Sequence, residues 1–361
     1  MDYPIFVGLD VHLSSISAAA FCTETGEYIQ KSFKGDDIEG IVKWSRSLGK
    51  QVKAVYESGF CGFHLQRALE GSGIPCAIAA ISKLSKPSGD KVKTDKRDAL
   101  FLARQFAVGN VICVHVPSIE REGMRDISRA LGIARAELTA AKLRVMQSHN
   151  RYGLRYLGKE RAWTRKWMSW ASSLCLPSAA AQRAYEHHYT RALILQGEKK
   201  ALEKEISVWC EDTAIKEKVT ALCAIKGISV VSAFCLVTEI GFFSRFKSAS
   251  GFSAFLGLVP SESSSGMTRR LGNITRTGNE YARKALIEAA WCYSRMKTHY
   301  KTPPSGLDPR LVAQAQKANR RLFERRRHLS ESKKPCVANA ATAREMAGWV
   351  WTVATMVEKG L

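Results

Sequence analysis

The chain has 361 residues and a formal net charge of +22, with a pI near 9.7. A charge of this size favours a polyanionic partner such as nucleic acid. No apolar run approaches the roughly 18 residues that a membrane-spanning helix requires, and Asp2 and Asp10 interrupt the region where a signal peptide would be apolar. We therefore expect a cytoplasmic protein without a membrane-spanning helix or a signal peptide.

Charge and cysteine usage refine this picture. The first 110 residues are nearly neutral, so almost all of the positive charge lies in the remainder of the chain. The ten cysteines include no C-x-x-C pair, and most have apolar neighbours. Small core residues in a reducing cytosol explain them better than disulfides or zinc ligands. A chain of this length suits two domains, or one domain with a helical insertion.

The N-terminal region alternates short apolar runs with helical segments. The first three runs are strand-like, with a hairpin turn at Gly26, and two further strands follow, each after a helix. The sequence predicts strands at 4–9, 16–22, 28–33, 52–56 and 75–81, helices at 38–47, 62–70 and from about 96, and a strand-like segment at 111–116.

Four acids occupy particular places in this order. Asp10 ends the first strand, Glu57 ends the fourth, and Asp95 and Asp98 are three residues apart at a helix start. Taken singly, Asp10 can be a turn residue, and Asp95 and Asp98 can serve a helix N-terminus electrostatically. Together, four converging carboxylates would repel one another unless cations were present. Two Mg²⁺ ions would neutralise them and could bridge a phosphodiester.

The order of strands and helices in this region resembles the RNase H-like fold. Within that fold, the Asp-Glu-Asp-x-x-Asp set resembles that of RuvC-type nucleases. Sugar kinases and actin-like ATPases share this fold and also end the first strand in Asp. They need a phosphate loop directly after that residue, whereas Val11-His12-Leu13-Ser14 follows here, and no later Gly-rich loop is found. The sequence therefore disfavours a kinase.

A long helix follows the break at Pro117. Apolar and small residues recur at alternating spacings of three and four for about four heptads, which indicates a coiled coil or a long helical hairpin, although an amphipathic core helix is the alternative. Helices at about 159–174 and 179–216 would provide the returning arm. The seam positions are Met124, Ile127, Leu131, Ala134, Leu138, Ala141, Val145, Ser148 and Tyr152.

Residues 222–241 have the spacing of a helix-hairpin-helix motif. An apolar helix reaches Lys226 and Gly227, and a second helix starts at Ser229. Such a turn offers backbone amides to a phosphate without reading base sequence. The alternative is a buried helix pair joined by a glycine.

A serine-rich loop follows at 260–266, and several basic residues come after it in the sequence. Hydroxyl nucleophiles beside guanidinium groups suit chemistry on a phosphodiester, and a polar loop before an ordinary helix is the alternative. The candidate residues are Ser261, Ser263, Ser264, Ser265, Arg269, Arg270 and Arg276.

The chain from 294 to 334 is strongly basic and is followed by a helix at 338–357. Four arginines are predicted to contact nucleic acid: Arg320, Arg321, Arg325 and Arg326. Salt should weaken this binding steeply. A solvated basic helix face is the alternative reading of this stretch.

The acidic set, the helical insertion and the motif G-L-V-P-S-E-S-S-S-G…G-N-I-T-R-T-G-N together resemble the DEDD-class transposases of insertion sequence family 110. These are bridge-RNA-guided recombinases, and the Piv DNA invertases are their relatives. The similarity covers nearly the whole chain. It implies a RuvC-like domain (1–117), a coiled-coil arm (118–216), a mainly helical transposase domain with the serine loop and the helix-hairpin-helix (217–300), and a basic segment with a C-terminal helix (301–361).

The resemblance also implies roles for individual residues. Asp10, Glu57, Asp95 and Asp98 would bind Mg²⁺, and Ser265, with Ser264 as the second candidate, would attack the DNA phosphate to form a phosphoserine. Family members work at a composite site between protomers, as dimers that pair into a tetramer around donor and target DNA with a guide RNA, in the bacterial or archaeal nucleoid. A metal-dependent junction-resolving nuclease without a serine intermediate is the main alternative, and an inactive nucleic-acid-binding relative is a third.

Overall fold

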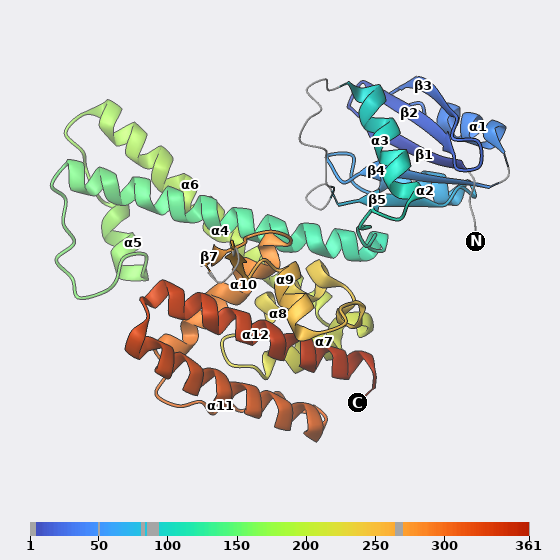
Figure 1. The fold of residues 1–361 in the computed structure, drawn as a ribbon. Helices are drawn as coiled ribbons and strands as arrows, with labels where there is room; N and C mark the ends of the chain where they lie inside the picture. The colour runs from blue at the N-terminus through green and yellow to red at the C-terminus, as the bar shows by residue number, and fades with distance from the viewer. Residues whose placement is uncertain (1–4, 50, 81–83, 85–93, 264–269, 361) are drawn as a thin grey trace. The chain divides into compact units, whose positions relative to one another are not determined.

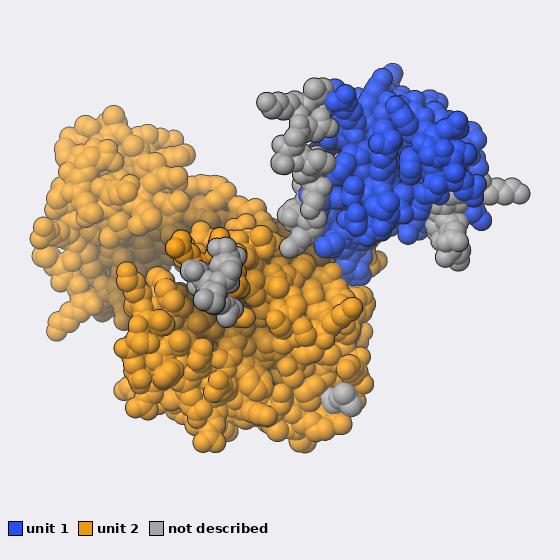
Figure 2. Space-filling view, in the orientation of Figure 1, with its two compact units in different colours: residues 1–117 blue, residues 118–361 orange. Residues whose placement is uncertain are grey.

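The computed structural model describes residues 5–49, 51–80, 84, 94–263 and 270–360. The chain forms two compact units, residues 1–117 and 118–361, which Figure 2 colours blue and orange. Within the described ranges, no helix combines the length and the apolar character that crossing a membrane requires.

Unit 1 is a five-stranded mixed sheet with helices on both faces (Figure 1). The strand order is β3-β2-β1-β4-β5; β1, β2 and β3 pair in antiparallel fashion, whereas β4 pairs in parallel with both β1 and β5. The elements are β1 Ile5–Val11, β2 Ser15–Cys22, β3 Tyr28–Lys34, α1 Ile38–Leu48, β4 Val52–Glu57, α2 His64–Gly71, β5 Cys76–Ala79 and α3 Asp95–Ala107.

The two faces of this sheet follow from the alternation of side chains along each strand. Leu9 and Tyr56 point to one face and form a core with Leu69 of α2. Val55 points to the other face and packs against Leu102 of α3. The predicted order of strands and helices is therefore observed, and α3 alone covers the second face among the described helices.

The strand predicted at 111–116 is wrong. This segment makes a single isolated bridge, Ala79 to Cys113. Two backbone hydrogen bonds join it to the sheet edge, from Ala80 N to Ile112 O and from Val114 N to Ile78 O. Its neighbour β5 has only four residues, so the ladder is too short for a strand.

Unit 2 is helical apart from one small hairpin (Figure 1). Its longest elements, α4 and α6, form an arm, against which α5 packs, and the remaining helices form a body. The elements are α4 Ile119–Arg151, α5 Arg165–Ser172, α6 Ala179–Trp209, α7 Thr213–Cys223, α8 Val230–Ile240, α9 Ala249–Phe255, β6 Pro260–Glu262, β7 Leu271–Ile274, α10 Glu280–Ala290, α11 Pro309–Ser332 and α12 Pro335–Glu358, with short 3₁₀ turns at Phe243–Arg245 and Trp291–Ser294.

The arm confirms the long helix and its returning partner. Leu138 of α4 packs near Leu195 of α6, whereas Val145, further along α4, packs near Tyr185, earlier in α6. The two helices therefore run antiparallel. Of the predicted seam positions, only the partly buried Ile127 and the C-capping Tyr152 are not buried.

Two predicted helix boundaries in the arm are wrong. The helix predicted at 159–174 is only Arg165–Ser172, because Trp163 adopts φ 69°, which an α-helix does not tolerate. The helix predicted at 179–216 divides into α6 and α7, because Asp212 takes an extended conformation and caps α7 by accepting from Ala214 N at 2.8 Å.

One core joins the body of unit 2. It includes Leu131 of α4, Phe234 of α8, Leu286 of α10, Leu322 of α11 and Val350 of α12. The basic segment 294–334, expected from its charge to contact nucleic acid, thus also contributes Leu322 to this core.

Candidate functional site: an acidic cluster and a serine hairpin

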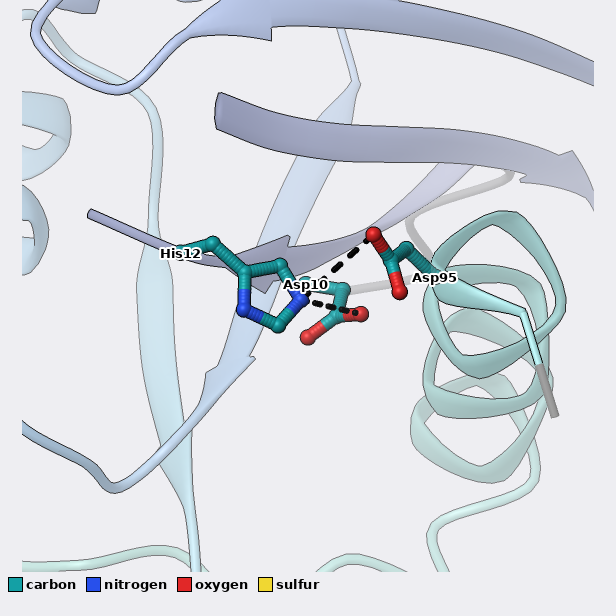
Figure 3. A group of neighbouring side chains, drawn as sticks. All are labelled: Asp10, His12 and Asp95. Carbon is teal, nitrogen blue, oxygen red and sulfur yellow. Dashed lines mark ion pairs between the residues drawn. The ribbon is translucent and has the colours of Figure 1, made fainter. Parts of the chain in front are cut away.

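Three polar side chains meet at the end of β1, and Figure 3 shows them. The Nε2 atom of His12 lies 3.3 Å from a carboxylate oxygen of Asp10 and 3.6 Å from one of Asp95. One possible ligand atom from each residue lies within 4.8 Å of the others, so the three can share one cation. The Asp10 side chain is 21% exposed and that of Asp95 is 55% exposed, so the cluster opens to solvent.

A glycine brings α3 close enough to β1 to build this cluster. A Cβ on Gly8 would lie 2.0 Å from the carbonyl oxygen of Ala99 and 2.7 Å from the amide nitrogen of Ala103. The helix therefore rests directly on the strand backbone. Gly8 and Asp10 are two residues apart on one strand, so both face α3.

The other two predicted acids belong to the same end of the sheet. Asp98 lies about one helical turn after Asp95, and its charge acts on Asp10. Glu57 ends β4, whose register with β1 makes Glu57 the neighbour of Asp10 on the α3 face. Glu57 and Asp98 nevertheless lie outside the group whose ligand atoms are within 4.8 Å of one another.

The electrostatics of Asp10 reflect this crowding. Burial is the main cause that raises the pKa of the Asp10 carboxyl, and His12 opposes it. The charges of Asp95 and Asp98 raise that pKa further. A bound cation would relieve this repulsion and favour the ionised carboxylates.

The donor set fits Mg²⁺ through its oxygens. Asp10 and Asp95 offer carboxylate oxygens, which are the ligands that Mg²⁺ prefers. Asp98 and Glu57 lie at the same end of the sheet. His12 adds a nitrogen, a donor that zinc and iron accept more readily than magnesium does. In the structure, its imidazole is close to both carboxylates.

His12 is the residue of this group that sequence reasoning missed. It follows Asp10 by two positions at the end of a strand, so the two side chains turn to one side. That spacing was the available signal.

The predicted serine loop is carried by the β6–β7 hairpin of unit 2. The amide of Ser263 donates to the carbonyl of Arg270 at 3.0 Å, beyond the paired strands. Ser264, Ser265 and Arg269 lie outside the described residues, so their roles stay predictions.

Two glycines fix the base of this hairpin. Gly257 and Gly278 have φ values of 65° and 74°, in the region that favours glycine. A Cβ on Gly278 would lie 1.8 Å from Phe255 O, and one on Gly257 would lie 2.3 Å from Thr277 O. The chain entering the hairpin and the chain leaving it thus cross in backbone contact. The exposed Arg276, at φ 55°, belongs to this crossing, and its amide donates to Gly257 O.

A buried carboxylate ties the end of this motif to the arm. Glu239 of α8 accepts two hydrogen bonds from Arg129, at 2.7 and 3.0 Å, and Arg125 lies 3.6 Å away. It also accepts from Asn279 Nδ2 at 2.7 Å, while Asn279 Oδ1 caps α10 through the amide of Ala282. The last Asn of the G-N…G-N motif is therefore a structural residue.

Lys226, predicted to contact nucleic acid, makes several contacts within the protein. Its amide donates to Asn319 Oδ1 at 2.7 Å. Its ammonium donates to the carbonyls of Thr298 at 2.7 Å and Tyr300 at 3.0 Å. These bonds fix the α7–α8 turn against the C-terminal segment.

Gly227, the next residue, has a packing role as well. Its φ is 91°, and a Cβ there would lie 2.4 Å from the carbonyl oxygen of Ala289 in α10. Ser229 then caps α8, as the sequence predicts. The helix pair and its turn are confirmed, and phosphate binding by Lys226 and Gly227 stays a prediction.

Three of the four arginines predicted on α11 reach the surface. Their side chains are 39–71% exposed and form ion pairs with nearby glutamates. Ion pairs of such exposed side chains contribute little to stability. Arg320 pairs with Glu324, and Arg321 and Arg325 pair with Glu345.

Arg326 is not a surface residue, which corrects its assignment as a nucleic-acid contact. It is only 4% exposed, and its guanidinium lies 5.4 Å from the ring centre of Trp291 and 3.4 Å from Asn339 Oδ1. The reason is its place on the buried stripe of α11, four residues after Leu322 and three before Leu329.

The acidic cluster and the net charge of +22 are together typical of proteins that process nucleic acid. Comparison with known proteins makes this class specific. A model of the "Transposase IS116/IS110/IS902 family" matches residues 219–303, which include the α7–α8 turn, the serine hairpin and α10.

Two relatives extend the match to most of the chain. It is 32% identical to y4qE, a Sinorhizobium fredii protein named as a transposase, over 97% of this chain and 88% of the relative. It is 27% identical to the transposase for insertion sequence element IS1533 of Leptospira borgpetersenii, over 92% and 99% of the two chains. The chain belongs to the IS116/IS110/IS902 family of transposases, and as a transposase it acts on DNA, which it cuts and rejoins.

Proposed function

We propose that this transposase is a DEDD-class, RNA-guided recombinase that exchanges DNA strands through a phosphoserine at Ser265, with Mg²⁺ held by Asp10, Glu57, Asp95 and Asp98. The observation that carries the proposal is that Asp10 and Asp95 offer ligand atoms close enough to share one cation. The family model also matches the stretch of chain that contains the serine hairpin.

Unit 1 supports an RNase H-like, RuvC-like domain. The resemblance rests on the order of strands and helices along the chain, and the sheet order β3-β2-β1-β4-β5, with three antiparallel strands followed by two parallel ones, supports it. The acids lie at strand ends and at a helix start, as the resemblance requires. This support comes from topology and placement together.

The proposed reaction exchanges one phosphodiester for another. The Ser265 hydroxyl oxygen bonds to phosphorus and loses its proton, and the bond from phosphorus to the 3′ oxygen breaks, so that the 3′ oxygen leaves as a hydroxyl. A 3′-hydroxyl from the other DNA then attacks the phosphoserine and releases the serine. Each step makes and breaks one P–O bond, so no nucleotide cofactor is required.

The protein's side chains have distinct tasks in this proposal. Bound Mg²⁺, two ions in the family pattern, would stabilise charge on the phosphate and activate the attacking oxygen. Arg269, Arg270 and Arg276 flank the hairpin tip in sequence and would offset charge on the pentavalent phosphorus. The acids and the serine would act on one phosphate at the composite site between protomers that the resemblance implies.

The proposed partners also come from the resemblance. They are donor and target DNA, a guide (bridge) RNA that pairs with both, and further copies of the chain as dimers that join into a tetramer, acting in the nucleoid. The high net charge supports binding to such polyanions.

The test uses the full chain with its guide RNA, Mg²⁺ and DNA from the ends of its own insertion sequence, followed by denaturation. We expect a covalent protein–DNA species that disappears in Ser265→Ala and when EDTA is added. A species lost in Ser264→Ala but kept in Ser265→Ala would move the nucleophile to Ser264.

A junction-resolving nuclease is the second candidate, because the cation-sized cluster is complete without the serine hairpin. In that case Asp10→Asn abolishes cutting, Ser265→Ala and Ser264→Ala cut normally, and no covalent species forms. The same gel therefore separates the two functions.

A further inference from the structure

Two hollows meet on one side of α12, next to the serine hairpin. The first has a volume of about 500 Å³ and is lined by Ile274 of β7, Trp291 and residues of α12. The second has a volume of about 510 Å³ and is lined by α9 and by Trp349. Ala341 and Arg344 line both, so the two hollows adjoin along α12, and we call them together the α12 groove.

Small residues on one face of α12 create this groove. The residues of this face recur at spacings of three and four and line the groove: Val337, Ala341, Arg344, Gly348 and Thr352. The opposite face of α12 is apolar and buried in the core of unit 2. Ala341 and Gly348 leave the floor low, and the lined stretch of helix extends for roughly 22 Å at 1.5 Å per residue.

The groove is positively charged. Arg276 at its hairpin end and Arg344 at its centre are exposed, and their guanidinium groups make no ion pair with any described residue. Glu345 also lines the groove, but it is already bonded to Arg321 at 2.8 Å and lies 3.5 Å from Arg325. Because neither guanidinium group pairs with a described residue, both are available for an anionic ligand.

Each hollow contributes one tryptophan. Trp291 lines the hairpin end, and Trp349 lines the far end. The buried Arg326 lies 5.4 Å from the Trp291 ring centre and so helps to hold this indole at the wall. Aromatic rings that alternate with cations are the recognised means of binding an unpaired strand, because bases stack on the rings and phosphates meet the cations.

We propose that the α12 groove binds an unpaired DNA strand, with bases on Trp291 and Trp349 and phosphates on Arg276 and Arg344. Duplex DNA keeps its bases stacked inside, so it cannot present them to the two rings. Each hollow has the size of a pocket for one small ligand, at the lower part of the usual 300–1,000 Å³ range. The choice of DNA rests on the proposed function, because β6 and β7 form the hairpin-end wall and the strand beside them would be the one that is cut.

The first test measures binding of the full-length protein to a fluorescent 12-nucleotide oligo(dT) and to a duplex of equal length, at one salt concentration. Ala341→Leu fills the point that both hollows share without changing charge, and Arg344→Ala removes the central cation. We expect each to weaken single-strand binding about tenfold, in the range found for one stacking or charge contact, and duplex binding less than threefold. The matched controls Ala180→Leu and Arg183→Ala, on the exposed face of α6, should leave both affinities unchanged.

The second test maps the contact. An oligonucleotide that carries 5-iododeoxyuridine is photo-crosslinked, and peptides are identified by mass spectrometry. Crosslinks at Trp291 or Trp349 support the proposal. Crosslinks only outside the groove, or oligo(dT) affinities in both variants equal to that of the unmodified chain, overturn it. Groove-dependent binding of oligo(U) tighter than that of oligo(dT) overturns the assignment to DNA.

These results are independent of the covalent-adduct test. Ser265→Ala is expected to bind oligo(dT) normally, because it leaves the two tryptophans and the two arginines that carry the proposal unchanged. If the unmodified chain forms no adduct but Arg344→Ala still weakens single-strand binding, the recombinase proposal fails and the groove stands. If the adduct forms and the groove variants bind normally, the groove proposal fails alone.

Discussion

Glu239 in unit 2 is a buried carboxylate and Asp10 in unit 1 is a partly buried one, and their surroundings differ. Glu239 has Arg129, Arg125 and Asn279 around it. Asp10 faces a second carboxylate, Asp95. Among the described residues, both acids have His12 as their ion-pair partner. Unit 2 therefore uses its buried acid to hold the fold, whereas unit 1 keeps its acids in an arrangement that a cation would stabilise.

This difference predicts that the Asp10 cluster matters for activity and not for folding. We expect Asp10→Asn to reduce strand cleavage about a thousandfold or more, because it removes a carboxylate from the proposed metal site. The measurement is the cleavage rate with Mg²⁺, with circular dichroism to show that the fold is kept. Asp36→Asn, an exposed acid of unit 1, makes the same charge change and should cut normally. Cleavage at an unchanged rate in Asp10→Asn would refute this assignment.

The opposite outcome is expected for Glu239. Glu239→Ala leaves Arg129 and Arg125 without their carboxylate, and breaking a buried pair in this way costs about 3–5 kcal/mol of unfolding free energy. Urea denaturation measures this loss. The control Glu324→Ala breaks an exposed pair with Arg320 and should cost under about 0.5 kcal/mol. Equal effects of the two substitutions would show that burial does not distinguish them.

Close packing of α3 on β1 gives the next effect in size. Gly8→Ala places a methyl group against the α3 backbone, so the helix must shift, at a cost of about 3 kcal/mol. Because α3 carries Asp95, cleavage should fall as well. Gly123→Ala in α4 meets no atom within 4 Å, and it should stabilise the protein by about 0.5–1 kcal/mol. A Gly8→Ala protein as stable as its parent would contradict the packing shown here.

The smallest effect is a pH dependence. The pKa of Asp10 in the folded protein is raised above 3.8, so the unfolded chain loses this proton first as the pH rises. Stability therefore falls between 3.8 and the raised pKa and is level above it. Melting temperatures in EDTA should show this decline in the unmodified protein and in Asp36→Asn, but not in Asp10→Asn. Parallel curves for all three proteins would disprove it.

Much of the fold could be predicted, because its signals are periodic. The seam of α4 has a regular spacing of three and four residues, and its buried positions include Leu131, Leu138 and Val145. The acids at 10 and 95 could be placed together because strand ends and helix starts occupy defined positions in an α/β unit. Local pattern and tertiary structure agree at these places.

Two of the misses concern residues whose partners are distant in sequence. Arg326 lies on a buried stripe, but its charge and its neighbours Arg325 and Arg327 gave the stronger signal. Glu239 lies in an apolar helix, and only the fold shows that Arg129, 110 positions away in sequence, neutralises it. The α12 groove is of the same kind, since the hairpin-end and far-end tryptophans are brought together by packing alone.

The most direct test of the phosphoserine proposal is to identify the amino acid that carries DNA. A nicked substrate whose cut end diffuses away would trap the intermediate, and protease and nuclease digestion would leave a nucleotide on one peptide. Mass spectrometry should place that nucleotide on Ser265 in the unmodified chain and find none in Asp10→Asn. Cut DNA without any modified serine, or a nucleotide on a residue outside the 260–266 loop, would contradict the mechanism.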